Sequence, residues 1–118
     1  MKIIAIDDDE FILAMMQKIL ARIAEVHTTV DHNVFSELVT IMKPDLLLVD
    51  LYMPEKSGIQ IMKELRTQGV KIPILVVSGN TNKTIKDEAL KYCNAYLKKP
   101  FNKFDLLEEI ERLKNGCG

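Results

Sequence analysis

Residues 1–10 run Met1-Lys2-Ile3-Ile4-Ala5-Ile6-Asp7-Asp8-Asp9-Glu10, a short apolar segment that is followed at once by four acids. Two further apolar segments also precede a polar residue, because Asp45–Val49 leads to Asp50 and Ile72–Val77 leads to Ser78. Each segment is largely continuous in its hydrophobicity rather than alternating, which is typical of strands buried on both faces of a parallel sheet. We therefore expect three central parallel strands, each with polar side chains after its carboxyl end.

Amphipathic stretches separate the apolar segments. Apolar residues recur in them at three- and four-residue steps, which is the spacing of one face of a helix. The predicted inward faces are Phe11, Ile12, Met15, Met16, Ile19, Leu20 and Ile23 in the first helix, Val34, Leu38 and Ile41 before Pro44 in the second, Ile59, Ile61, Met62 and Leu65 before Gly69 in the third, Ile85, Ala89 and Leu90 within residues 82–92 in the fourth, and Phe104, Leu107, Ile110 and Leu113 after an Asn102 cap in the fifth. Asp9 and Glu10 are expected to cap the first helix. With Val26–Val30 and Ala95–Lys98 as weaker strands, this alternation predicts a doubly wound α/β fold with helices on both faces of a five-stranded parallel sheet.

The length and composition fit one domain over residues 1–118. Hydrophobic residues make up 47% and charged residues 28% of the chain, as in an ordinary globular protein. Sixteen basic residues nearly balance 17 acidic ones, so the overall charge favours neither a nucleic-acid backbone nor an anionic membrane as a partner. No signal peptide follows Met1, and no apolar run approaches the ~20 residues that span a bilayer. We expect a cytoplasmic domain.

The cysteines predict neither a disulfide framework nor a zinc site. Cys93 and Cys117 are the two cysteines of the chain, which is too few for a disulfide scaffold. Their spacing from His27 and His32 matches no zinc pattern. We expect Cys93 to be half-buried and Cys117 to lie in the C-terminal tail, both as reduced thiols.

The polar side chains after the strands indicate where the chemistry takes place, because ligands of open parallel sheets bind at the carboxyl ends of the strands. Asp7, Asp8 and Asp50 supply carboxylates there, Ser78 a hydroxyl and Lys99 an amine. If the carboxylates meet, two of them about 4 Å apart repel by roughly 4 kcal/mol at an effective dielectric of about 20, so the cluster favours a cation. Oxygen ligands without His or Cys indicate Mg²⁺ rather than zinc. A carboxylate nucleophile beside a metal ion and a lysine is typical of proteins that form an aspartyl phosphate.

Four segments of the chain together resemble the receiver domain of two-component response regulators, from end to end. They are Ile4–Glu10, Pro44–Pro54 with Gly58 after it, Pro73–Gly79 and Ala95–Phe101, in the order and at the spacing of that family. The resemblance implies a flavodoxin-like three-layer sandwich with the strand order 2-1-3-4-5. In that order the first and third strands are neighbours, and their acids converge.

The resemblance also implies roles for the acidic residues. Asp50 would be the phosphoacceptor, which takes a phosphoryl group from a phosphohistidine of a sensor histidine kinase or a phosphotransfer protein. Asp8 would be the direct carboxylate ligand of Mg²⁺, and Asp7 would bind the ion through a water molecule. Asp50 would also belong to the metal site, and Tyr52 would contribute its backbone carbonyl. The domain would then assist its own phosphorylation and dephosphorylation as a signalling domain rather than act as an enzyme on a separate substrate.

The same resemblance implies how phosphorylation is signalled. Ser78 and Lys99 would contact phosphoryl oxygens, Tyr96 would turn inward as Ser78 moves, and the peptide between Lys99 and Pro100 would be cis. The face built from the fourth helix, the fifth strand and the fifth helix would dock an output protein, with the chain a monomer or a phosphorylation-dependent dimer. The residues alone also allow Tyr96 to be an ordinary half-buried strand aromatic. Whether residues 115–118 are a natural tail or the cut end of a longer protein, we expect output through the domain's own surface.

Some residues depart from the usual family pattern. Ser78 stands in place of the commoner Thr. Asn94 lies in a turn where the family often has Gly, and this predicts that Asn94 adopts the left-handed backbone conformation.

Tyr52 and Asn80 occupy positions that in this family influence the attack of water on the phosphorylated form. We therefore expect the bulk of Tyr52 to lengthen the lifetime of that form. Gly58 is interpreted as a turn residue that needs no ligand.

Two alternative functions match parts of the sequence. Asp7–Asp9 fits the Asp-x-Asp start of a haloacid-dehalogenase-like phosphatase, but that motif continues to Thr or Val where this chain has Phe11, and the second acid role needs a longer chain. The second alternative is a phosphorylation-independent interaction module with the receiver fold. Such a module would be expected to lack one of the acids of the cluster, or Asp50, or Lys99, and this chain has all of them.

Overall fold

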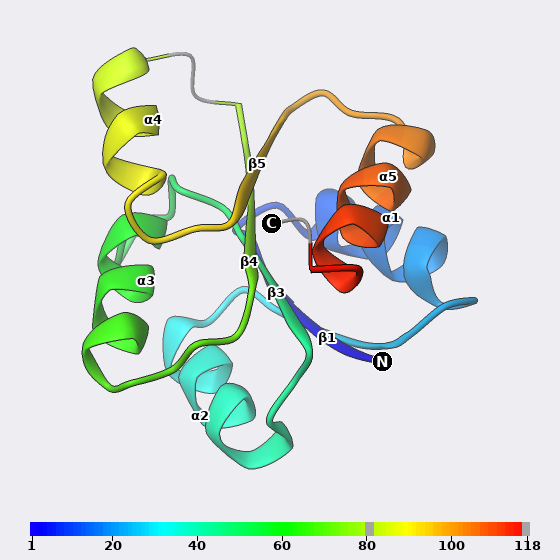
Figure 1. Cartoon of the computed structure of the whole chain (residues 1–118), viewed down its shortest axis with the longest axis horizontal. Helices are drawn as coiled ribbons and strands as arrows, with labels where there is room; N and C mark the ends of the chain where they lie inside the picture. Colours follow the sequence, from blue (N-terminus) through cyan, green and yellow to red (C-terminus); the bar gives the residue numbers. More distant parts are fainter. Residues whose placement is uncertain (80–81, 117–118) are drawn as a thin grey trace.

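The computed structural model describes residues 1–79 and 82–116 of the chain, so Asn80 and Cys117 lie outside the described residues. Strands and helices alternate along it (Figure 1). In chain order they are β1 (Lys2–Ile6), α1 (Glu10–Leu20), β2 (Glu25–Thr29), α2 (His32–Met42), β3 (Leu46–Val49), α3 (Gly58–Thr67), β4 (Ile74–Ser78), α4 (Lys83–Ala89), β5 (Ala95–Lys98) and α5 (Lys103–Lys114). Within the described ranges, no helix is both long and apolar enough to cross a membrane.

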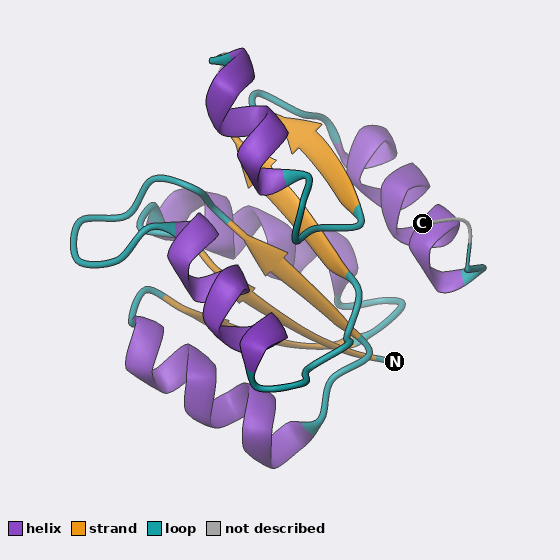
Figure 2. Ribbon diagram, turned by 60° about the vertical axis from the view of Figure 1, so that its left-hand side comes forward, coloured by secondary structure: helices purple, strands orange, loops and turns teal. Residues whose placement is uncertain are grey.

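The strands form one parallel sheet in the order β2-β1-β3-β4-β5. Helices α1 and α5 cover one face, and α2, α3 and α4 cover the other, as Figures 1 and 2 show. This arrangement confirms the predicted doubly wound, flavodoxin-like sandwich and its strand order. β1 pairs directly with β3, with Ile6 opposite Val49. The residues that follow these two strands therefore start from adjacent positions at the same edge of the sheet.

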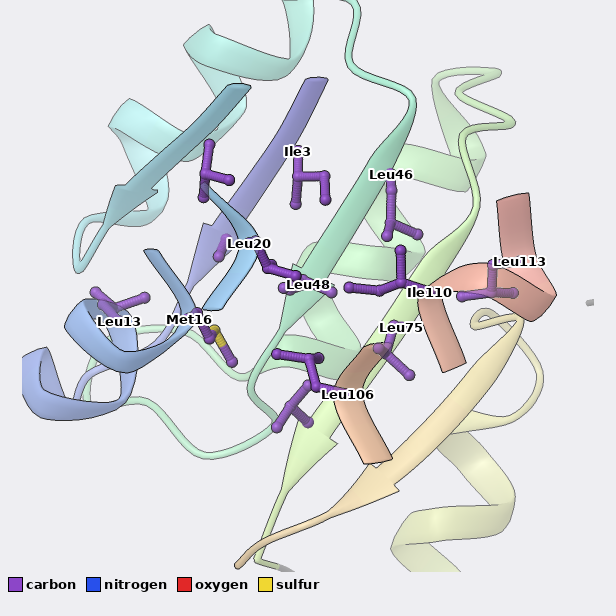
Figure 3. Packing of buried hydrophobic residues seen from close by; sticks show 13 residues of the cluster. Ile3, Leu13, Met16, Leu20, Leu46, Leu48, Leu75, Leu106, Ile110 and Leu113 are labelled. Atoms are coloured by element: carbon purple, nitrogen blue, oxygen red, sulfur yellow. The ribbon is translucent and has the colours of Figure 1, made fainter. Parts of the chain in front are cut away.

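The core has two parts, one on each face of the sheet. β3 and β4 are buried along their whole length and β1 is buried except at Lys2, as their continuous hydrophobicity predicts. β2 and β5 are only partly buried because they are the edge strands, which accounts for their weaker sequence pattern. Figure 3 shows the core beneath α1 and α5, whose labelled residues are Ile3, Leu13, Met16, Leu20, Leu46, Leu48, Leu75, Leu106, Ile110 and Leu113.

The inward faces of several helices differ from the prediction. On α1 the structure buries Leu13, whereas Phe11 is 88% exposed. On α2 it buries Phe35, whereas Val34 and Ile41 are exposed. These helices carry apolar residues around more of their circumference than one core-facing stripe requires, so their periodicity is compatible with more than one orientation and packing on the sheet selects among them. The other predicted inward residues that are exposed are Met15, Ile23, Leu90 and Phe104.

The start of α1 confirms the predicted helix cap. The carboxylate of Asp9 accepts hydrogen bonds from the backbone N–H groups of Phe11 at 2.9 Å and Ile12 at 3.4 Å, and Glu10 occupies the first turn. The carboxylate of Asp9 is thus occupied by the helix backbone, while its backbone N–H donates to Oδ1 of Asp7 at 2.9 Å. Cys93 is half-buried and a free thiol, as expected.

The prediction of a left-handed Asn94 is wrong. Lys43 is the non-glycine residue with a positive φ among the described residues. Asn94 instead uses its side chain, because its Oδ1 atom accepts hydrogen bonds from the backbone N–H of Ile74 at 2.9 Å and from Nη2 of Arg66 at 3.1 Å. The remaining donors of Arg66 bind the backbone carbonyls of Val70, Ile72 and Tyr92. Arg66 thus joins the end of α3 to the segment between α4 and β5.

Candidate functional site

Three carboxylates meet at the carboxyl ends of β1 and β3. Asp7 and Asp8 follow β1, Asp50 follows β3, and one carboxylate oxygen of each lies within 4.8 Å of the others. The backbone N–H of Asp50 donates to the carbonyl of Ile6 at 3.1 Å, which continues the pairing of the two strands beyond their ends. Asp7 is fully buried and Asp50 is 5% exposed, whereas Asp8 is exposed to solvent. The structure therefore brings together the three acids that the sequence singled out.

Lys99 supplies the opposing charge. Its Nζ atom lies 2.7 Å from Oδ2 of Asp7 and 3.7 Å from Oδ1 of Asp50. The backbone N–H of Lys99 donates to the carbonyl of Ser78 at 2.9 Å, so the pairing of β4 and β5 carries the lysine to the site. The peptide between Lys99 and Pro100 is cis, as expected.

Burial raises the pKa values of the two enclosed acids. Burial and then the charge of Asp7 raise the pKa of Asp50 to about 7; the charge of Asp8 adds to the rise, while Lys99 and the backbone N–H of Tyr52 oppose it. Burial also raises the pKa of Asp7, against the hydrogen bond from Lys99 and one from the backbone N–H of Asp9. Two buried carboxylates thus share one ammonium group, and the remaining negative charge favours a divalent cation.

The ligand types of the cluster fit Mg²⁺. Of the Asp, Glu, His and Cys side chains in the described part of the chain, those of Asp7, Asp8 and Asp50 form a group that could share one ion. Carboxylate oxygens suit a hard cation, and an exposed member such as Asp8 leaves room for the waters that Mg²⁺ usually keeps. Tyr52, whose backbone carbonyl is the expected fourth protein ligand, follows Asp50 by two residues and has an exposed side chain.

Ser78 and Tyr96 come together on neighbouring strands. Ser78 ends β4 and is fully buried. Burial raises the pKa of the half-buried Tyr96 hydroxyl, and a hydrogen bond with the side chain of Ser78 opposes that rise. The Nζ atom of Lys86, on α4, lies 5.1 Å from the centre of the Tyr96 ring. A chain of side-chain contacts therefore runs from the end of β4 through β5 to α4.

Comparison with known proteins identifies the family. The response regulator receiver domain family matches residues 3–111 of the chain. The chain belongs to this family. Among its relatives, the cell cycle response regulator CtrA of Brucella ovis is 30% identical over 115 residues, which cover 96% of this chain and 50% of CtrA. The transcriptional regulatory protein CiaR of Streptococcus pneumoniae is 36% identical over 75 residues, 63% of this chain and 34% of CiaR. The matched part of this chain thus covers half of the length of CtrA and about a third of the length of CiaR.

Solved receiver structures match over nearly the whole chain. The receiver domain of the Francisella response regulator 1452 superimposes with a TM-score of 0.90 at 25% identity, over 99% of this chain and 98% of that one. The Vibrio cholerae chemotaxis protein CheY4 gives a TM-score of 0.87 at 29% identity, over 94% and 96% of the two chains. The predicted membership of the receiver family, a family of signalling domains, is confirmed.

Two features of this receiver domain's site were missed from the sequence. The spacing of residues predicts that Lys99 reaches the acids, but it carries no signal that the ammonium lies nearer to Asp7 than to Asp50. These partners are 92 residues apart in the chain, so their contact depends on how β1 and β5 are placed by the sheet. The second feature is Gly58, which was interpreted as a turn residue and which lies against the backbone of Asp50.

Proposed function

We propose that this receiver domain accepts a phosphoryl group on Asp50 from the phosphohistidine of a sensor histidine kinase or a phosphotransfer protein. The observation that carries the proposal is the meeting of three carboxylates with the ammonium group of Lys99, 2.7 Å from Asp7 and 3.7 Å from Asp50. It occurs beside the switch in strand order, where doubly wound proteins bind ligands. Kinase and acceptor must share a compartment for the transfer, and we propose the cytoplasm.

Asp50 would act as the nucleophile. One of its carboxylate oxygens would bond to phosphorus as the P–N bond of the phosphohistidine breaks, and the electron pair of that bond would leave on the imidazole nitrogen, which takes up a proton. The ammonium of Lys99 and the hydroxyl of Ser78 would contact the transferred oxygens. Mg²⁺, held by Asp7, Asp8 and Asp50 and by the carbonyl of Tyr52, would supply charge neutralisation when bound. Water would later hydrolyse the acyl phosphate to phosphate and the free carboxylate.

The contacts of Ser78 support a route from the site to the α4–β5–α5 face. If the Ser78 hydroxyl moves to bond a phosphoryl oxygen, this movement would alter its hydrogen bond with Tyr96, which in turn contacts Lys86 of α4. Phosphorylation would thereby shift the population of arrangements of this face. We propose that this face docks an output protein. The receiver domain itself would be a monomer or would form a dimer that depends on phosphorylation. The exposure of Leu90 and Phe104 at 46% and 68% favours a contact that is partly apolar.

Incubation with acetyl phosphate and Mg²⁺, followed by intact mass measurement, tests the proposal. We expect one added phosphoryl group on the wild type, and none on Asp50→Asn or in the presence of a chelator. Asp87→Asn, which changes an exposed acid of α4, is the matched control and should be labelled like the wild type. Absence of label on the wild type would instead favour the phosphorylation-independent interaction module. Sustained turnover of a phosphate ester would favour the aspartate-nucleophile phosphatase.

A further inference from the structure

Gly58, the first residue of α3, lies against the backbone of the proposed phosphoacceptor. A Cβ atom at position 58 would be 2.1 Å from the carbonyl oxygen of Asp50 and 2.9 Å from its carbonyl carbon, and also 2.9 Å from Cα of Leu51. Real Cβ atoms essentially never approach other heavy atoms within 3.0 Å. Any side chain here would therefore push α3 and the Asp50–Leu51 peptide apart by almost 1 Å.

Space, and not backbone conformation, is the reason for glycine at this position. The described glycines with a positive φ are Gly69 and Gly116, so Gly58 has a backbone that other residues can adopt. The other glycines have room around them: no atom lies within 4 Å of a Cβ at Gly69, and the nearest at Gly79 is Cβ of Lys99 at 3.9 Å. Among the glycines that the structure describes, the close approach is specific to Gly58.

Both sides of the contact are held in place. On the α3 side, the buried residues Ile61, Met62 and Leu65 pack in the core. On the strand side, the N–H of Asp50 is bonded to Ile6, and Leu51 is buried. The two sides are joined directly, because the backbone N–H of Gly58 donates to the carbonyl of Leu51 at 2.9 Å. Neither side can retreat without breaking hydrogen bonds or core packing.

We propose that Gly58 is a positioning residue for phosphoryl transfer: its lack of a side chain lets α3 fix the Asp50–Leu51 peptide, and with it the Asp50 carboxylate, where the other two acids of the cluster meet. This inference rests on the proposed function of Asp50. Mg²⁺ demands near-ideal octahedral geometry at about 2.0–2.1 Å, and a misplacement of about 1 Å can slow a reaction by about 100-fold. A methyl group at position 58 is therefore expected to weaken both metal binding and phosphorylation.

The test compares Gly58→Ala with two variants that lose stability for other reasons. Ser57→Ala removes the cap at the start of the same helix without adding an atom beside Asp50, and Gly69→Ala strains a backbone with φ of +86° away from the site. Mg²⁺ affinity is measured from amide NMR shifts, and the labelling rate with acetyl phosphate from intact mass, both corrected for the folded fraction from urea unfolding. We expect Gly58→Ala to lose about tenfold or more in both quantities, and the two controls to keep both within about twofold.

Each other outcome decides against the inference. If Gly58→Ala is less stable but keeps its Mg²⁺ affinity and its labelling rate, as expected of the two controls, Gly58 has only a packing role. If this variant stays unfolded even at low temperature with a stabilising osmolyte, the glycine is a folding requirement and not a positioning residue. If the wild type, measured alongside, binds no Mg²⁺ and takes no label, the proposed function itself is refuted, and this inference with it.

Discussion

Replacing Asp50 by Asn should stabilise the metal-free protein, and the gain should grow with pH. Folding raises the pKa of this buried carboxyl from an ordinary 3.8 to about 7, chiefly through burial and then through the charge of Asp7. At about 1.4 kcal/mol for each pH unit, ionised Asp50 costs the folded state on the order of 4 kcal/mol at most. Asn has nearly the same shape and no charge. We therefore expect Asp50→Asn to be more stable than the wild type by about 2 to 4 kcal/mol at pH 8.

The sign of this effect follows from where the proton is held more tightly. An acid whose pKa is raised by folding keeps its proton better in the folded chain than in the unfolded chain. Its contribution to stability is complete below pH 3.8 and is lost as the pH rises through about 7. The wild type and Asp50→Asn should thus differ least near pH 4, and the gap should open mainly between about pH 4 and 7.

Urea unfolding in the presence of a chelator, across this pH range, measures the gap. Asp87→Asn is the matched control, because it makes the same change from acid to amide at an exposed position on α4. Added Mg²⁺ should then stabilise the wild type more than Asp50→Asn, since a ligand of the folded state raises stability by mass action. The reasoning is refuted if Asp50→Asn is no more stable than the wild type at pH 8, or if its gain is the same at every pH.

Three further predictions concern packing and the lifetime of the phosphorylated form. Arg66→Met should lower the free energy of unfolding by about 2 to 4 kcal/mol, because it removes the guanidinium donor from three backbone carbonyls and one of the two donors from Oδ1 of Asn94. An unchanged urea midpoint would contradict this. Leu13→Ala should lower the free energy of unfolding by about 2 to 5 kcal/mol, and Phe11→Ala should lower it by less than about 0.5 kcal/mol. The reason is that the side chain of Leu13 is buried, whereas that of Phe11 is 88% exposed. Equal losses for the two variants in urea unfolding would show that the assigned face of α1 is incorrect. Tyr52→Ala should speed the loss of the phosphoryl group severalfold, because the exposed ring is expected to restrict the attacking water; intact mass measured over time after donor removal checks this, and an unchanged decay would exclude such a role.

The core-facing side of the helices was the least predictable part of the fold. Val34 and Ile41 have the spacing of an inward face, and so does Phe35 together with Val39, but α2 can turn only one of these pairs toward the sheet. Phe35 and Val39 are buried and Ile41 is 75% exposed. Periodicity describes a helix by itself, whereas the side that is buried depends on the strands against which it packs. The strands β1, β3 and β4 were predictable because they are buried on both faces, so their orientation did not have to be chosen.

The sequence by itself determined the alternation of strands and helices, the buried central strands and the presence of Asp7, Asp8, Asp50 and Lys99 after the strands. Those features depend on backbone geometry within one element and on the rule that parallel strands end at a common edge. Only the tertiary structure decided that Lys99 lies nearer to Asp7 than to Asp50, and that α3 approaches Asp50 closely enough to exclude any side chain at Gly58. The Lys99–Asp7 contact joins residues 92 apart in the chain, and the Gly58–Asp50 contact joins two consecutive elements. In both cases the distance is set by the packing of the sheet and its helices, which no local pattern of residues encodes.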